Sequence, residues 1–225
     1  MGQYYMAYVG NDEGQKVFCP QSAIYMTKNG IERSSDITER SYSDDPNSWG
    51  SNFSGLKLME HSWLENDFVN GVLESIWDNP SKVAWVGDYA NADSDFDEHR
   101  YAKGYTKEVY ETVWGDGQDE RERPFDEVPT IHMDGYILNL DQGLYIDLRR
   151  YASVAGFKPR WSEDTWTIHP LPLLTCIGNG RGGGDYWGTC MDMVGTWAMD
   201  KIVFTEEWPS AFKEVDYSTI KFAEE

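Results

Sequence analysis

The fold is decided by the stretch Ser62–Val86, SWLENDFVNGVLESIWDNPSKVAWV. Large apolar residues recur in it every three or four positions, which is the spacing that lines up one face of an α-helix. Such a face has to be buried, so the pattern predicts a helix over residues 63–77 packed on the rest of the domain. The residues of this face are Leu64, Phe68, Val69, Val72, Leu73 and Ile76.

Polar residues mark both ends of the predicted helix. Ser62 followed by Glu65 forms an S-x-x-E capping box, which satisfies free N–H groups at a helix start. Asn79-Pro80 ends the helix, because proline lacks an N–H group and restricts the residue before it. The run Lys82–Val86 that follows predicts a short strand, with Asp88 at its end.

Two pairs of apolar runs on either side predict antiparallel hairpins. Residues 3–9 (QYYMAYV) and 16–19 (KVFC) form the first pair and are separated by a polar turn that contains glycine. Tyr136–Leu140 and Leu144–Leu148 form the second pair around Asp141-Gln142-Gly143, and we expect this hairpin to lie at the centre of the sheet. Later strand-like segments lie at Thr165–His169, Leu173–Ile177, Met193–Ala198 and Lys201–Thr205.

The remaining segments are rich in loop-forming residues. Residues 34–54 are dominated by Ser, Asp, Asn and Pro and predict a long loop or insertion. Residues 91–130 are acidic and loop-rich, with one helix expected around Lys107–Val113. No internal repeat or linker divides the chain, so we predict a single α+β domain over residues 1–225, in which the helix at 63–77 packs on a mainly antiparallel sheet.

Charge limits the range of functions. The formal net charge is −20 at pH 7 and the isoelectric point is near 4.4, so the chain repels nucleic acid and anionic membranes. A basic protein is the partner that such a charge favours, and a nucleic-acid-handling enzyme or defence factor has the required basic surface. Ten Trp, fourteen Tyr and nine Phe supply rings that suit sheet faces and interaction surfaces.

The acidic excess is largest between residues 93 and 127, which carry twelve acids and five bases. Solubility alone explains many acidic surfaces. The functional interpretation is a shaped acidic surface that meets the basic partner. Its candidate residues are Asp93, Asp95, Asp97, Glu98, Asp116, Asp119, Glu120, Asp126 and Glu127.

Cysteine use and hydropathy indicate a cytoplasmic protein. Cys19, Cys176 and Cys190 are too few for a disulfide framework and form no C-x-x-C pair, so we expect reduced structural thiols. No stretch of eighteen apolar residues is present, and Met1 is not followed by a signal-peptide pattern.

Three blocks of sequence resemble a group of uncharacterised proteins from bacteria and their phages. The blocks are MGQYY at 1–5, GLKLMEHSW at 55–63 and GNGRGGGDYWG at 178–188. Their spread indicates that the resemblance covers most of the chain, although it carries no activity to transfer. It implies a microbial or mobile-element setting, in which small proteins often bind and inhibit another protein.

The third block is also the strongest candidate for a ligand site. Gly178, Gly180 and Gly183 satisfy G-x-G-x-x-G, but no helix follows to receive a pyrophosphate, so a Rossmann site is rejected. A looser anion site remains, in which backbone amides and Arg181 hold an anion while aromatic rings stack on a base. A wide turn that needs glycine only for its geometry is the competing interpretation. The candidate ligand-binding residues are Asn179, Arg181, Asp185, Tyr186 and Trp187.

Catalytic and metal-binding patterns are weak. His61, Asp88 and His169 are the candidates for acid–base chemistry beside the glycine-rich block, since a His with a carboxylate suffices for a general base. The acids that begin at Asp93 resemble a calcium loop, but they lack the required glycine and the final bidentate acid, and the histidines lack metal-ligand spacing. We therefore expect no metal and no cofactor.

Two hypotheses follow. The first is a non-enzymatic acidic binding protein that inhibits a basic partner by occupying its nucleic-acid-binding surface. The second is a protein that binds or hydrolyses a nucleotide or other phosphorylated small molecule at Gly178–Gly188.

Overall fold

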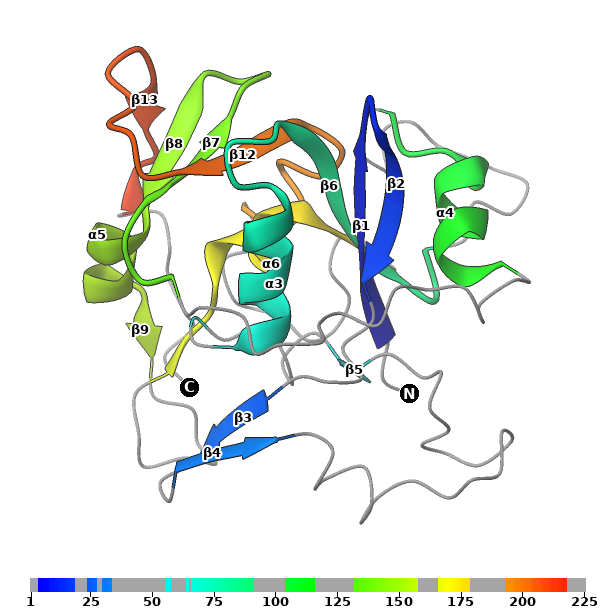
Figure 1. The fold of residues 1–225 in the computed structure, drawn as a ribbon, viewed down its shortest axis with the longest axis horizontal. Coiled ribbons are helices and arrows are strands. Elements are labelled where there is room, and N and C mark those ends of the chain that lie inside the picture. The colour runs from blue at the N-terminus through cyan, green and yellow to red at the C-terminus, as the bar shows by residue number, and fades with distance from the viewer. Residues whose placement is uncertain are drawn as a thin grey trace.

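The chain folds around one mixed sheet, as the computed structural model shows (Figure 1). The structure describes residues 4–18, 24–27, 30–33, 56–57, 64, 66–90, 104–115, 132–157, 166–178 and 193–217. The predicted loop at 34–54 and most of the acidic region at 91–130 lie outside these residues.

Nine strands form the sheet, and its main path runs β13-β8-β7-β12-β6-β1-β2. β11 pairs with β6 and β5 pairs with β1 beside this path. All pairs are antiparallel except β11 with β6 and β13 with β8. The strands are β1 Tyr4–Asn11, β2 Gly14–Phe18, β5 Leu56–Lys57, β6 Ser81–Gly87, β7 Tyr136–Asn139, β8 Leu144–Asp147, β11 Cys176–Ile177, β12 Lys201–Thr205 and β13 Lys213–Glu214.

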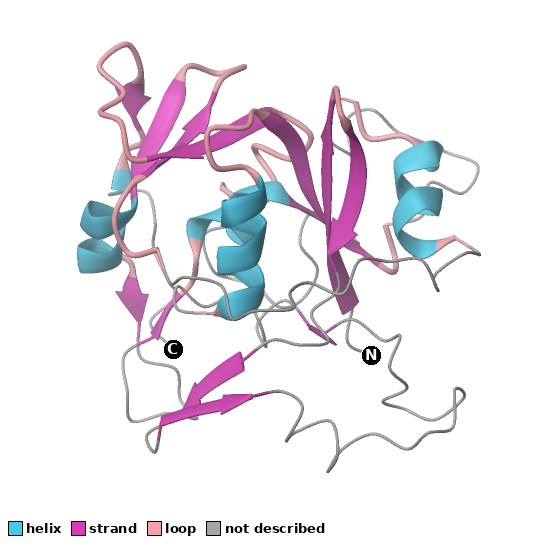
Figure 2. Ribbon diagram, viewed as in Figure 1, coloured by secondary structure: helices cyan, strands magenta, loops and turns pink. Residues whose placement is uncertain are grey.

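Two short ladders lie apart from the sheet, and four helices complete the described structure (Figure 2). The ladders are β3 Ile24–Thr27 with β4 Gly30–Arg33, and β9 Gly156–Phe157 with β10 Trp166–Thr167. The helices are α3 Asp67–Ser75, α4 Lys107–Trp114, α5 Leu148–Val154 and α6 Pro170–Thr175. The predicted class, a single α+β domain with a mainly antiparallel sheet and a principal helix packed on it, is confirmed.

The principal helix packs where its apolar pattern predicts, but it is shorter than 63–77. Asn66 is the N-cap: its side-chain oxygen accepts hydrogen bonds from the backbone N–H groups of Phe68 and Val69. The predicted start at Ser62 is wrong, because the N–H of Leu64 donates to the carbonyl of Thr167. At the other end, the backbone of Ile76 and Asp78 pairs with Phe204 of β12, which draws the chain out of the helix before Asn79-Pro80.

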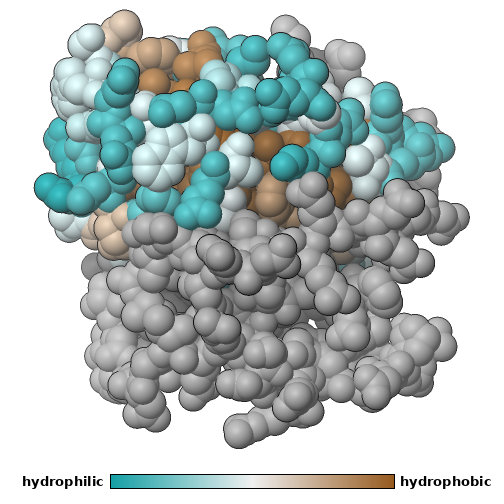
Figure 3. Space-filling model, viewed as in Figure 1, coloured by the Kyte–Doolittle hydropathy of each residue, from teal (hydrophilic) through white to brown (hydrophobic). Residues whose placement is uncertain are grey.

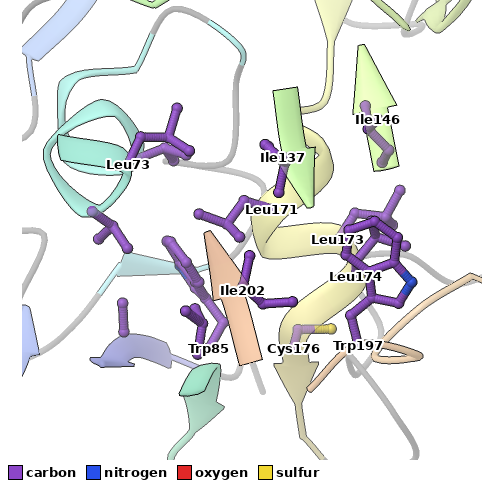
Figure 4. Packing of buried hydrophobic residues seen from close by; sticks show 14 of the residues in the cluster. Leu73, Trp85, Ile137, Ile146, Leu171, Leu173, Leu174, Cys176, Trp197 and Ile202 are labelled. Atoms are coloured by element: carbon purple, nitrogen blue, oxygen red, sulfur yellow. The ribbon is translucent and has the colours of Figure 1, made fainter. Parts of the chain in front are cut away.

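The inner face of the sheet, defined as the face covered by α3 and α6, holds the main core. Phe68 of α3 meets Trp85 of β6 edge to face, with ring centroids 5.7 Å apart. Figure 4 shows the leucines of α6 among the side chains of the strands and Trp197. Residues of this core that are fully buried include Tyr5, Val69, Val72, Leu73, Ile137, Ile146, Leu171, Leu173 and Ile202.

The outer face is the opposite side of the same sheet, and its two ends differ. At the β6–β1–β2 end, Val109 and Val113 of α4 cover alternate residues of the strands, such as Tyr8 and Val86. At the β7–β8–β12 end, the outward residues form a separate small cluster: Leu138, Tyr145 and Val203, with Tyr136, Leu140 and Phe212 beside them. α4 confirms the helix expected around Lys107–Val113.

Both predicted hairpins are present as β1–β2 and β7–β8. The expectation that the second one lies at the centre is wrong, since β12, β6 and β1 lie between it and the far edge of the sheet. β12 confirms the strand predicted at Lys201–Thr205, whereas in the segment predicted at 165–169, of which residues 166–169 are described, Trp166–Thr167 form a strand.

The strand predicted at Leu173–Ile177 is wrong over most of its length. His169 caps α6 and Pro170 occupies the first turn, where a missing N–H group costs nothing, so only Cys176–Ile177 pairs with β6. The predicted strand at Met193–Ala198 is a series of turns. Gly195 has a φ of +68°, and a Cβ there would lie 2.4 Å from the carbonyl oxygen of Cys176.

Candidate functional site

The predicted acidic surface lies outside the described residues. This holds for all nine of its members: Asp93, Asp95, Asp97, Glu98, Asp116, Asp119, Glu120, Asp126 and Glu127. Acidic side chains nevertheless outnumber basic ones by about two to one among the described residues, as they do in the whole chain. The described framework therefore carries part of the negative charge. Figure 3 shows hydrophilic side chains over much of the described surface in that view, with hydrophobic ones between them.

The second candidate region begins where β6 and β11 end. These strands run parallel with Ile177 opposite Val86, so Gly178 and Gly87 leave the sheet side by side and Asp88 follows. The Tyr110 hydroxyl donates to the Asp88 carbonyl at 3.0 Å, which ties α4 to this turn. The structure thus brings Asp88 to the start of the glycine-rich block, at the type of strand end where ligands often bind.

The other members of this candidate site are not described. His61 and the five ligand-binding candidates lie outside the described residues: Asn179, Arg181, Asp185, Tyr186 and Trp187.

His169 is placed for a structural role. Its imidazole is fully buried, and Nδ1 accepts a hydrogen bond from the Leu171 N–H group at 3.0 Å as the N-cap of α6. Burial lowers the pKa of His169 from 6.5 to about 3, so the ring is neutral at physiological pH. A neutral ring whose Nδ1 already accepts a bond, and which solvent does not reach, supports the helix in this structure.

A histidine–carboxylate pair that the sequence did not single out lies on the inner side. His132 Nε2 is 3.5 Å from Glu74 Oε1, and the backbone N–H group of His132 donates to Asn70 Oδ1. The rings of Trp77 and Phe204 pack on the imidazole, with centroids 4.8 and 5.2 Å away. The pair has the composition that a general base needs, but the two rings enclose the imidazole, so the geometry supports packing.

A group of three aromatic rings at the β7–β8–β12 end was also missed. We call Tyr136, Tyr145 and Trp208 the outer aromatic cluster. Their ring centroids are 5.6 to 5.9 Å apart and each pair meets edge to face. Trp208 is 63% exposed, the most exposed of the large apolar side chains in the described ranges. Trp208 therefore presents its ring to solvent, whereas Tyr145 is buried and Tyr136 is partly buried.

Carboxylates border the outer aromatic cluster. Glu206 and Glu207 directly precede Trp208 and are exposed, while Glu214 lies opposite Tyr145 in the β13–β8 ladder. Burial raises the pKa of the Tyr145 phenol above 10.0, and the negative charge of Glu214 adds to the rise. The positive charge of Arg150, which pairs with Glu214, acts in the opposite direction on the same pKa.

Other kinds of site find no support in the described part of the chain. There, no three His, Cys, Asp or Glu side chains gather closely enough to hold a metal ion. Among its helices, none has the length and apolar character needed to cross a membrane.

Comparison with known proteins gives no match, whether to a family model, a curated protein or a solved structure. The function has to be inferred from the geometry and charge of the chain itself.

Proposed function

We propose that the chain is a non-enzymatic acidic protein that binds the basic, nucleic-acid-binding surface of a protein partner and inhibits that partner in the cytoplasm. The observation that carries this proposal is the negative charge, which the described framework shares with the rest of the chain. Carboxylates fixed on a sheet can occupy positions that phosphates take in a nucleic acid, and opposite charge accelerates the encounter.

Three basic side chains of the described residues each neutralise one carboxylate. Lys107 pairs with Glu111 at 3.3 Å, Arg149 pairs with Asp134 at 2.6 Å, and Arg150 pairs with Glu214. A base that already binds a carboxylate is a weaker attraction for phosphate. In the described ranges no basic side chain pairs with Glu206 or Glu207, so these acids are available to a partner.

A bacterial or phage setting, which the three sequence blocks predict, is part of the same proposal. In that setting a partner with a basic groove is a nucleic-acid-handling enzyme or a defence factor. The whole-chain charge of −20 gives a reason why such a groove would prefer this protein to a neutral competitor.

Affinity capture followed by competition tests the proposal. The tagged chain would be used to capture proteins from a bacterial extract at low salt, and each captured nucleic-acid-binding protein would be purified. We expect the chain to displace a labelled DNA duplex from that protein in fluorescence anisotropy. The affinity should fall about tenfold or more when salt rises from about 50 to about 200 mM.

The control for this experiment is the duplex mixed with the chain alone, which should not bind. Displacement that does not respond to salt, or a captured partner that keeps its DNA in excess chain, would refute the proposal.

A second function is favoured by one observation, the meeting of Asp88 with Gly178 where β6 and β11 end. It is the binding of a nucleotide or other phosphorylated small molecule at Gly178–Gly188. A thermal-shift screen of nucleotides tests it, since a ligand at a hundred times its dissociation constant adds about 2.7 kcal/mol of stability. Arg181→Ala should abolish the shift, and the absence of any shift with the unmodified chain would exclude this function.

A further inference from the structure

The outer aromatic cluster has the rigidity that a binding surface needs. Trp208 rests edge to face on Tyr136 and Tyr145, and the Ser210 N–H group donates to the Trp208 carbonyl at 3.0 Å. The next residue, Pro209, is buried and its carbonyl accepts a bond from the Phe212 N–H group. The indole is thus held in place while most of its surface faces solvent, so little ordering is needed before a partner binds.

The surroundings of the cluster select a cationic partner. The register of the sheet places Asp147 opposite Tyr136 and Glu214 opposite Tyr145. Lys213 lies opposite Leu144, which packs on the main core, so its side of the ladder is the inner one. Arg150 already neutralises Glu214, so the carboxylates on this side that have no basic partner among the described residues are Asp147, Glu206 and Glu207.

We propose that the outer aromatic cluster receives an arginine or lysine side chain from the basic partner, and that Glu206 and Glu207 pair with basic residues next to it. This inference rests on the proposed function and assigns it a site. A cation over the face of an indole is attracted by the ring quadrupole, and a guanidinium also stacks on it. Exposed Trp and Tyr side chains of this kind carry much of the binding energy in protein interfaces.

A second copy of the chain is a poor occupant of the same surface. A symmetric contact would bring the carboxylates that border one cluster against those of the other, and each chain already carries a charge of −20. Charge complementarity therefore favours a basic partner.

The test uses a fluorescein-labelled nona-arginine peptide as the probe, with anisotropy recorded at low salt. We expect Trp208→Ala to weaken binding about fivefold and Trp208→Phe to retain most of it, since a smaller ring keeps a π face. The matched control is Tyr89→Ala, another exposed aromatic. Tyr89 lies just after the C-terminal end of β6, whereas Trp208 follows β12, which pairs with the N-terminal end of β6. The loss of the Tyr89 ring should therefore leave binding unchanged.

Charge variants give a second, independent readout. Glu206→Lys combined with Glu207→Lys should weaken binding about tenfold or more. Asp12→Lys combined with Glu13→Lys makes the same change of charge at the turn between β1 and β2, and β2 is the edge strand at the other end of the sheet from β13. This control variant should weaken peptide binding less.

The outcomes separate the site from the function. If the unmodified chain does not bind the peptide at low salt, the proposed function fails. If it binds, but Trp208→Ala behaves like Tyr89→Ala and both charge variants weaken binding equally, the function stands and the site is wrong. Sedimentation that shows a dimer dissociated by Trp208→Ala would assign the surface to a second copy and overturn the inference.

Discussion

The outer face of the sheet is closed in two different ways at its two ends. Over β6, β1 and β2, helix α4 lies on the strands, and the side chains beneath it, such as Met6 and Val86, are fully buried. Over β7, β8 and β12, the described residues provide three aromatic rings, and Trp208 at their centre is mostly exposed. The same alternation of side chains thus produces a sealed core at one end and an accessible aromatic surface at the other.

Hydrogen bonds reinforce the difference. Two side chains at α4 bond to the C-terminal end of β6 and the turn that follows it. The Tyr105 hydroxyl donates to the Ala90 carbonyl, and the Trp114 indole N–H donates to the Val86 carbonyl. The side chains of the outer aromatic cluster form no hydrogen bond with any other described residue, and they contact one another edge to face. We conclude that the α4 end contributes mainly to stability, whereas the other end is free to serve binding.

Two valines on the two ends give the largest expected difference. Val86 is fully buried beneath α4, so Val86→Ala should lower the free energy of unfolding by about 2.5 kcal/mol through lost burial and the cavity left behind. Val203 is 7% exposed in the small cluster, where neighbouring rings can settle into the gap, so Val203→Ala should cost about 1 kcal/mol. Urea unfolding measures both, and equal losses would mean that the two ends are equally sealed.

His169 is fully buried, so its titration serves as a reference for a part of the fold that solvent does not reach. Because its pKa is lowered to about 3 in the folded chain and is near 6.5 when unfolded, the unfolded chain binds a proton first as the pH falls. The contribution of neutral His169 to the free energy of unfolding is present above pH 6.5, and about 2 kcal/mol of it is lost between pH 7 and pH 5.

The matched variant for this measurement is His169→Asn, which keeps a capping side chain and removes the titration. The difference between the two unfolding free energies, followed from pH 7 to pH 5 by urea titration, isolates the effect of His169 from that of the carboxylates. A constant difference over this range would show that solvent reaches the imidazole.

The sequence predicts the elements whose signals are local. The apolar spacing around Phe68 and Val72 identifies α3, and Gly104 and Gly115 bracket α4. The exact start of α3 was missed because the partner that holds Leu64 is the distant Thr167. Leu173–Thr175 was assigned to a strand but is helical, because a wholly apolar segment has no period that separates helix from strand.

The outer aromatic cluster was missed for a related reason. Tyr136 and Tyr145 belong to one hairpin, but Trp208 reaches them from more than sixty residues away, after β12 has paired with β7. Nothing near Trp208 in the sequence signals this meeting.

A small effect on stability is expected at the residue that carries the proposed aromatic contact with the partner. Trp208 is mostly exposed and makes two edge-to-face contacts, so Trp208→Ala should lower the free energy of unfolding by only about 1 kcal/mol. The urea midpoint should therefore stay close to that of the unmodified chain while peptide binding weakens. A loss as large as that of Val86→Ala would place Trp208 among the residues that seal the sheet and would remove the contrast between the two ends.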